Sequence, residues 1–258
     1  MKTVDIVYIV GRGSVWQNNE LRFSLRSIAK YGKNIGRVII AGECPKFIDK
    51  STIVHVPCKD AGKVKHANIM MKINAVIDAL KMKQPFLISS DDHFLTCVTD
   101  FSNYPIISKG KLTVEEGSGE YFRSLNQTRD WLMQRGLPIF KTNPHYNTWI
   151  DPKVFKRLLP DILEANETCA PDGIEINCAM GNTLIHGGAS YVTLKDCKVQ
   201  EPHAIDWWRQ RLCERPAMSI GDSALTRSFA AFLIETFPEQ SPYEAEGTSL
   251  RKMFNPHA

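Results

Sequence analysis

Strand patterns and helix patterns alternate through the first ninety residues, and this alternation constrains the fold more than any other feature. Short runs rich in Val and Ile occur at residues 4–10, 37–41, 53–57 and 85–89. Between them, residues 18–31 and 66–81 carry apolar side chains at helical intervals. Strands that are joined through a helix run parallel, because the crossover between them is right-handed. The pattern therefore predicts an α/β fold, a three-layer α/β/α sandwich around a mostly parallel central sheet.

The alternation loosens in the second part of the chain. Residues 111–124 contain two glycines and several charges, and they predict a long loop or a hairpin. Helices are predicted at residues 125–135, 151–163, 172–180 and 222–237. We find no internal repeat, low-complexity segment or linker in the sequence. We therefore expect one domain over residues 1–258, with a second half, residues 101–258, made of helices and loops.

Composition narrows the setting in which the chain works. Its 258 residues have a mean hydropathy of -0.23 and no apolar run near 18 residues, which predicts no membrane span. The first ten residues predict a strand and not an export signal. Seven cysteines without C-x-x-C spacing favour a reduced, cytoplasmic setting and argue against structural zinc. The net charge of +4 is compatible with phosphate-bearing ligands or nucleic acid, but it is too small to diagnose DNA binding.

An acidic motif, Ser89 to His93, follows the apolar run of residues 85–88 directly. Open α/β folds bind their substrates at the carboxyl ends of the strands, so Asp91, Asp92 and His93 are expected at that edge. Adjacent carboxylates repel each other, and a divalent cation would compensate their charge. We interpret the motif as a metal and diphosphate site. The alternative is a solvated turn in which Asp92 caps a helix.

Glycines and basic residues near the same edge are candidates for binding phosphate. Gly11, Arg12 and Gly13 follow the first strand, where glycine lets the backbone approach a ligand and arginine can pair with a phosphate. Arg22 and Lys72 lie on the two following helices and extend this group. The alternatives are an ordinary turn for the glycines and ordinary surface charges for the two side chains.

Several common catalytic patterns do not occur in the sequence. It has no G-x-S-x-G elbow, no G-x-x-x-x-G-K-[ST] loop and no H-E-x-x-H pair. These absences argue against acyl hydrolysis, P-loop nucleotide hydrolysis and zinc-dependent proteolysis. Metal-assisted group transfer from a nucleotide-activated donor remains as the hypothesis for the activity.

Four blocks of sequence occur in an order that one group of enzymes shares. They are Asp5–Tyr8 with Asn19–Ile28, Ser90–Phe94, His145–Phe155 and Phe237–Glu244. The first is similar to a strand followed by N-E-L-R-Y-S-L-R-S-I, and the second stands where N-D-D-M-F or a metal-binding D-x-D is found. Together the blocks resemble glycosyltransferases of the GT-A fold, in particular the Stealth family of capsule sugar-phosphate transferases and related short phage glycosyltransferases. The W-V-D-G motif of that family is replaced here by Ile9–Gly13.

The resemblance implies a GT-A-like fold and transfer of a sugar from a nucleotide-diphosphate sugar to a hydroxyl. It implies that Asp92, with Asp91 and His93, holds Mn²⁺ or Mg²⁺ against the diphosphate. Residues 1–100 would bind the nucleotide sugar, with Gly11, Arg12, Gly13, Arg22, Lys72 and Asp91 contacting the donor, and residues 101–258 would face the acceptor. An inverting enzyme needs a base, for which the candidates are Asp172, Asp222, Glu175 and His145, and Asp172 is favoured because it sits in a Pro-Asp-Gly turn that opens a helix.

The acceptor side is represented by an aromatic and basic patch, Trp207, Trp208 and Arg209, which could stack on a sugar or a base. The alternative places one tryptophan in the core and the other at its rim. A hydroxymethylated pyrimidine in phage DNA is one expected acceptor, which would place the enzyme in the host cytoplasm. The other readings are a sugar-phosphate or glycan-directed transferase, and a nucleotide-binding module without activity.

Overall fold

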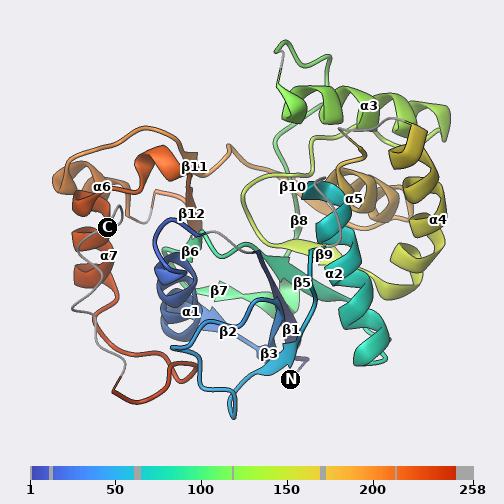
Figure 1. Ribbon diagram of the computed structural model, residues 1–258. Coiled ribbons are helices and arrows are strands. Elements are labelled where there is room, and N and C mark those ends of the chain that lie inside the picture. The colour runs from blue at the N-terminus through green and yellow to red at the C-terminus, as the bar shows by residue number, and fades with distance from the viewer. Residues whose placement is uncertain are drawn as a thin grey trace.

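The structure is a computed structural model. It describes residues 2–11, 14–60, 65–117, 119–168, 173–212 and 214–247. At its centre lies a sheet in the order β4-β3-β1-β5-β9 (Figure 1). β1 (Val4–Val10), β3 (Ile35–Gly42), β4 (Val54–Val56) and β5 (Phe86–Ser89) are parallel, and β9 (Thr148–Ile150) is antiparallel to β5.

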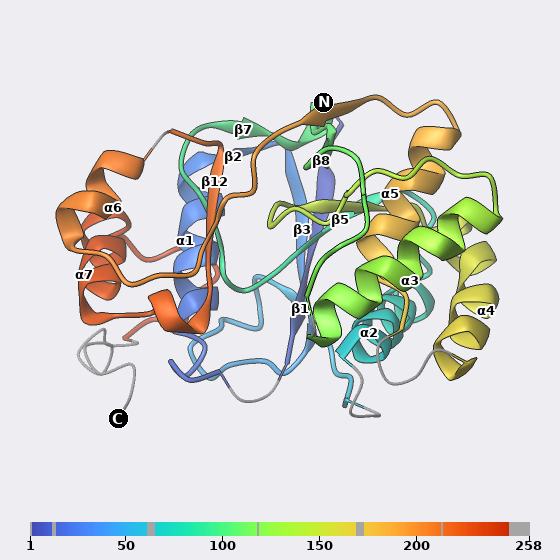
Figure 2. The same cartoon turned by 90° about the horizontal axis from the view of Figure 1, so that it is seen from above.

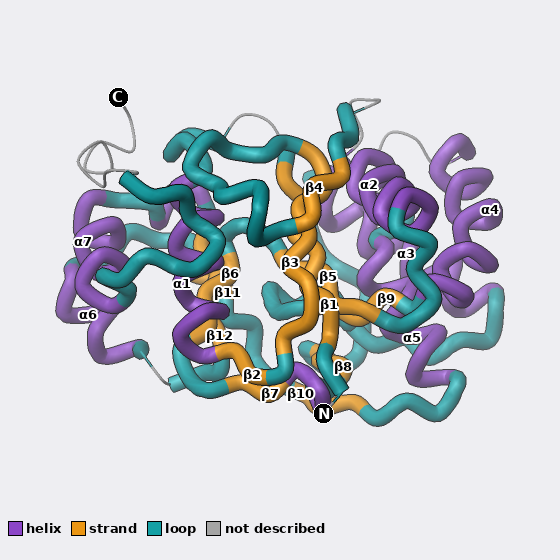
Figure 3. Tube along the Cα trace, turned by 90° about the horizontal axis from the view of Figure 1, so that it is seen from below, coloured by secondary structure: helices purple, strands orange, loops and turns teal. Residues whose placement is uncertain are grey.

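Helices cover both faces of this sheet, as Figures 2 and 3 show. α1 (Asn19–Tyr31) covers one face. The other face is covered by α2 (Lys65–Ala79), α3 (Glu120–Gln134), α4 (Pro152–Thr168) and α5 (Ile176–His186). The alternation of β1 side chains explains the two cores, because Ile6 and Tyr8 pack with α1 while Val7 packs with α2. The predicted α/β fold with a mostly parallel sheet is confirmed.

A further layer, which the sequence pattern did not predict, lies beyond α1. β6 (His93–Leu95) pairs antiparallel with β12 (Ala217–Ile220), and β11 (Lys198–Val199) pairs with β12. α6 (Ile205–Arg211) and α7 (Arg227–Thr236) pack against these elements (Figure 2). The remaining elements are β2 (Gly32–Lys33), β7 (Thr99–Asp100), β8 (Ile106–Ser108), β10 (Tyr191–Thr193), η1 (Phe101–Asn103) and η2 (Asp222–Ala224).

Three helix predictions differ from the structure at their boundaries. The predicted loop over residues 111–124 ends at Gly119, because α3 begins at Glu120. α5 begins at Ile176, where the Glu175 carboxylate accepts from the backbone N–H of Cys178. The predicted helix over residues 222–237 is split, because Thr226 caps a new helix after η2. A side-chain cap therefore marks the start of α5 and of α7, whereas α3 begins after Gly119 without one.

The order of the strands fixes where a ligand would bind. From β1 the chain passes through α1 to β3 on one side, and it later returns through α2 to β5 on the other side of β1. The carboxyl ends of β1 and β5 are therefore the point at which the strand order reverses, where open α/β sheets leave a crevice. Gly42 lies at this edge with φ +113°, and a Cβ there would lie 2.0 Å from the Val10 carbonyl oxygen.

None of the helices in the described ranges combines the length and the apolar content that a bilayer crossing requires.

Candidate functional site

The acidic motif lies at the carboxyl end of β5, as the sequence predicted. After Ser89 the chain turns, with the His93 N–H donating to the Ser90 carbonyl at 3.3 Å, and β6 begins at His93. Asp92 does not cap a helix, because a strand follows it. The two carboxylates therefore stand between two strands, next to the edge at which the strand order reverses.

The charge of Glu20 acts on Asp91, and the charges of Asp92 and Asp222 act on Glu20, so we call Glu20, Asp91, Asp92 and Asp222 the acidic cluster. Glu20 lies in the first turn of α1 and is buried, and Asp222 lies in η2. Burial and the charges of Asp92 and Glu20 raise the pKa of Asp91 to about 7. Burial also raises the pKa of Glu20, to which Asp92 and Asp222 add, against a hydrogen bond from Ser14. The cluster thus holds more negative charge than its surroundings compensate.

Asp92 is oriented by the second half of the chain. The Ser219 hydroxyl of β12 donates to Asp92 Oδ2 at 2.9 Å. The Lys198 Nζ of β11 lies 3.9 Å from the same oxygen, and the Nε2 of His93 lies 3.9 Å from Oδ1. The outer strands β11 and β12 therefore bring residues from far along the sequence to the motif.

His93 is buried beneath the motif. Burial lowers its pKa to about 4, so the imidazole is neutral near pH 7. Its Nδ1 is buried without a hydrogen-bond partner. Ser24 of α1 donates to the His93 carbonyl, which leaves the Tyr8 hydroxyl to donate to Ser24 at 3.0 Å. This buried network ties β1, α1 and β6 together under the acidic cluster.

The donor atoms in this region suit a hard divalent cation. Among the described residues, no three or more His, Cys, Asp and Glu side chains gather closely enough to hold a metal ion by themselves. Mg²⁺, however, is usually held by one or two carboxylates together with substrate phosphate oxygens and water. The carboxylates of Asp91 and Asp92, with the unpartnered Oε2 of Glu20, fit that requirement. His93 is the least suited of the predicted ligands, because Mg²⁺ prefers oxygen.

A histidine and an aspartate form a pair close to this cluster. The Nδ1 of His145 lies 2.9 Å from Oδ1 of Asp196, and the Lys109 ammonium donates to Oδ2 of Asp196 at 2.9 Å. Burial raises the pKa of Asp196, but His145 and Lys109 outweigh it and hold the net pKa well below the ordinary value. The charges of His145 and Asp196 both act on His93, which places the pair beside the motif. A carboxylate bound at Nδ1 leaves Nε2 of a neutral imidazole as a proton acceptor.

The predicted donor-binding residues separate into two groups. Gly11 is exposed at the end of β1, and Arg12 and Gly13 lie outside the described residues. Lys72 is buried, donates to the Val10 carbonyl at 3.0 Å and pairs with Asp60 at 2.6 Å, so it lies at the same sheet edge. Arg22 lies elsewhere.

Arg22 does not face the acidic cluster. Its Nε lies 3.7 Å from Oε2 of Glu244, and its guanidinium lies 4.3 Å from the centre of the Phe47 ring. Burial lowers its pKa, against the charge of Glu244. The structure thus gives Arg22 packing partners at the far side of α1, and we do not carry it into the proposed donor site.

The predicted catalytic residues also lie in different places. Asp222 is exposed near Glu20, and His145 belongs to the pair with Asp196. Glu175 is buried as the cap of α5. Asp172 lies outside the described residues. Asp196 was not predicted from the sequence, because no motif surrounds it.

The aromatic and basic patch is divided by the structure. Trp208 is fully buried in the core beyond α1, with its ring centre 4.6 Å from that of Phe229. Trp207 lies at the rim of that core, half-buried. Arg209 is exposed and paired with Asp206 and Glu235 on the surface. One tryptophan in the core and one at its rim is the alternative that the sequence analysis left open.

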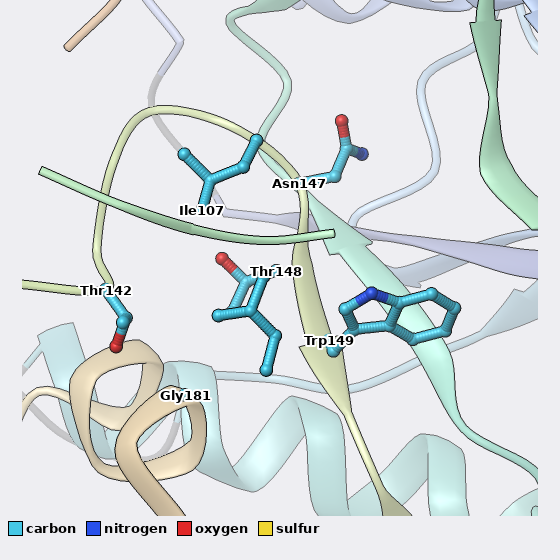
Figure 4. A pocket seen from close by; sticks show the side chains of 7 residues that line it. Ile107, Thr142, Asn147, Thr148, Trp149 and Gly181 are labelled. Carbon is cyan, nitrogen blue, oxygen red and sulfur yellow. The ribbon is translucent and has the colours of Figure 1, made fainter. Parts of the chain in front are cut away.

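Two cavities differ greatly in size. A cavity between β8, β9 and α5, lined by Asn147, Trp149 and Gly181 among others, has a volume of only about 10 Å³ (Figure 4). That volume holds no more than a water molecule. The second cavity, of about 360 Å³, lies between β11, β12 and α6 and is lined by Lys198 and Trp207 among others. Only the second is large enough for a substrate.

Comparison with known proteins finds similarity among solved structures. No protein-family model and no curated protein matches the chain. Among solved structures, the chain is similar to an active-site mutant of LgtC, with a TM-score of 0.47 and 12% sequence identity over 92% of this chain and 97% of that chain.

Proposed function

We propose that the chain is a metal-dependent transferase that moves a sugar from a nucleotide-diphosphate sugar to a hydroxyl acceptor. The observation that carries this proposal is the position of Asp91 and Asp92 at the carboxyl end of β5, beside the reversal point of the sheet. Crevices at such points bind nucleotides, and adjacent carboxylates there suit a cation that binds a diphosphate. The block resemblance to GT-A glycosyltransferases agrees with this proposal.

Asp91 and Asp92 would hold Mn²⁺ or Mg²⁺, and Ser219 would keep Asp92 oriented through its hydrogen bond. When bound, the cation neutralises the charge that builds on the departing diphosphate. The ammonium of Lys72 and the backbone at Gly11 lie at the same edge, where the donor would approach. The protein would thus supply two carboxylates for the cation and one ammonium group at the same sheet edge.

His145 is the base that we propose for an inverting reaction. Its Nε2 would accept the proton of the acceptor hydroxyl, while Asp196 holds Nδ1–H and stabilises the imidazolium that forms. The sequence favoured Asp172 as the base, but the contacts of His145 with Asp196 support His145 in that role. A histidine held by a carboxylate is an arrangement that active sites use for general base catalysis.

Transfer of a sugar phosphate from the nucleotide sugar, as in the Stealth family, is the second candidate, because the same cation site would serve it. The acceptor could also be a hydroxymethylated pyrimidine in DNA, or a glycan. An electrophoretic mobility shift with modified and unmodified duplexes at low salt separates these acceptors. Retarded modified duplex supports DNA, and the absence of any retardation removes it.

The proposal is tested by thermal shift with nucleoside diphosphates and their sugars, with and without Mn²⁺. A matching donor should raise the melting temperature only when Mn²⁺ is present, because ligand binding stabilises the folded state. Asp92→Asn should abolish both this shift and transfer while leaving the fold intact. Asp161→Asn, which changes an exposed aspartate on α4, is the matched control and should behave as wild type. Donor binding that is independent of Mn²⁺ and of Asp92 would contradict the proposal.

A further inference from the structure

The cavity of about 360 Å³ lies beside the acidic cluster but is not part of it. Its walls come from β11, β12, α6 and the loops around α6, which lie together at one end of the molecule in Figures 1 and 2. Lys198 joins the two places, because it lines the cavity and its Nζ lies 3.9 Å from Asp92. A molecule bound in the cavity would therefore lie next to the proposed cation site.

One wall of the cavity is a stack of side chains. The imidazole of His203 and the indole of Trp207 are 3.6 Å apart and nearly parallel, at 8°. The guanidinium of Arg211 lies 4.8 Å from the centre of the Trp207 ring. The Trp208 Nε1–H donates to the His203 carbonyl, which anchors this stack to the core. The stack holds a guanidinium in place at the cavity, so that little side-chain entropy is lost when it binds a ligand.

The charge of the cavity lining favours an anion. Lys198, Arg211 and Arg215 line it, against the carboxylates of Glu201 and Glu214. Arg211 pairs with Glu214, but both side chains are 47% exposed, so that water weakens this pair. Arg215 donates to the backbone carbonyl of Asp196, an acceptor that carries no formal charge. Two guanidiniums are therefore available to an anionic group that enters the cavity.

We propose that this cavity binds a phosphorylated ring compound, with its phosphate at Arg211 and Arg215 and its ring against His203 and Trp207. Its volume lies within the range of about 300–1,000 Å³ that small-molecule sites occupy. That this ligand is the acceptor rests on the proposed function. The ligand is either a sugar phosphate or a nucleotide unit of a DNA strand, which share the phosphate and the ring.

The test is isothermal titration calorimetry without Mn²⁺, using glucose 6-phosphate and thymidine 5′-monophosphate, with glucose and thymidine as the unphosphorylated partners. At least one phosphorylated probe should bind, and its unphosphorylated partner should bind about tenfold more weakly or not at all, because a charge-assisted hydrogen bond is lost. Preference for glucose 6-phosphate indicates a sugar phosphate, and preference for the nucleotide indicates DNA. Binding of neither phosphorylated probe, or equal binding of the unphosphorylated partners, would overturn the proposal.

Arg211→Gln and Trp207→Ala should each weaken binding of the phosphorylated probe about tenfold or more. Arg135→Gln is the matched control, because Arg135 also lies over an indole, that of Trp131 at 4.3 Å, and pairs with a carboxylate, but it does not line this cavity. Loss of binding in Arg135→Gln, or unchanged binding in both cavity variants, would count against the site. Asp92→Asn should retain probe binding, so that failure of the cavity and failure of the proposed transferase give different results.

Discussion

The guanidinium of Arg26 and the carboxylate of Glu244, 218 residues apart in the sequence, form a buried bidentate ion pair. Nε donates to Oε1 at 2.7 Å and NH2 donates to Oε2 at 2.8 Å. A third guanidinium nitrogen donates to the Phe237 carbonyl at 2.9 Å. Both side chains are almost inaccessible, at 1% and 0% exposed. The pair fastens the segment after α7 to α1, and α1 carries Glu20 at its other end.

Arg26→Ala should destabilise the protein by about 3–5 kcal/mol, because it removes both close hydrogen bonds from Arg26 and leaves the buried Glu244 carboxylate only the Arg22 guanidinium at 3.7 Å. The free energy of unfolding in urea measures this effect. Arg37→Ala provides the control, because Arg37 forms an ion pair with Asp5 at 2.7 Å but is 48% exposed. The control should lose no more than about 1 kcal/mol. Similar losses in the two variants would show that burial does not decide the strength of the Arg26 pair.

This pair also shows where sequence reasoning reached its limit. Arg22 and Arg26 are four residues apart on a helix, a spacing typical of solvated charges or of a phosphate site. Their shared partner, Glu244, could not be identified from local spacing, because it comes from the far end of the described chain. The resemblance placed both segments in separate blocks, and the structure shows that the blocks meet.

The four parallel strands of the central sheet were predictable because the long amphipathic helices α1 and α2 alternate with them, whereas β9, with three residues, was not predicted. The outer strands were not, because β6, β11 and β12 contain three, two and four residues, too few for a period-two pattern to stand out. Ser219 and Asp196 were missed with them, since each becomes part of the site only through tertiary pairing. The acidic motif was found because two carboxylates directly after a buried strand are unusual in local sequence.

The repulsion within the acidic cluster should lower the free energy of unfolding when no cation is bound. Because the pKa of Asp91 is raised to about 7 from 3.8, its contribution to stability is fully present below about pH 3.8 and is lost as the pH rises through 7. Asp91→Asn should therefore raise the melting temperature of the metal-free protein at pH 8, by about 2–4 °C. The difference should vanish at pH 3.5. Mn²⁺ should stabilise the wild type and not the variant.

Differential scanning fluorimetry at pH 8 and pH 3.5 measures both effects. The exposed Asp161→Asn serves as the control and should show neither the gain at pH 8 nor the loss of the Mn²⁺ response. An Asp91→Asn variant that melts below the wild type at pH 8 would mean that Asp91 is compensated within the protein, contrary to the charge balance described here.

Asp196 should have the opposite dependence on pH. Its folded-state pKa lies below the ordinary 3.8, so its contribution to stability is present above that value and is lost as the pH falls below it. Asp196→Asn should flatten the acid limb of a stability profile recorded between pH 6 and pH 3 by urea unfolding. Asp49→Asn offers a comparison, because two hydrogen bonds from Ser51 lower the pKa of Asp49 without any charged partner. An unchanged acid limb in Asp196→Asn would show that His145 and Lys109 do not stabilise this carboxylate.

The proposed roles of His145 as base and Asp196 as its orienting partner predict specific changes in kcat. His145→Gln should lower kcat by about 10²–10⁴-fold, the usual contribution of a general base, while donor affinity in the presence of Mn²⁺ is unchanged. Asp196→Asn should lower kcat as well, because the orientation and the stabilisation of the imidazolium are lost. It should also shift the pH dependence of kcat, which a purely structural change would leave unaltered. His203→Gln is the control for removing a histidine, since His203 stacks on Trp207 away from Asp196, and its effect should fall on acceptor KM and not on kcat. Full activity of His145→Gln with an unchanged pH profile would exclude His145 as the base.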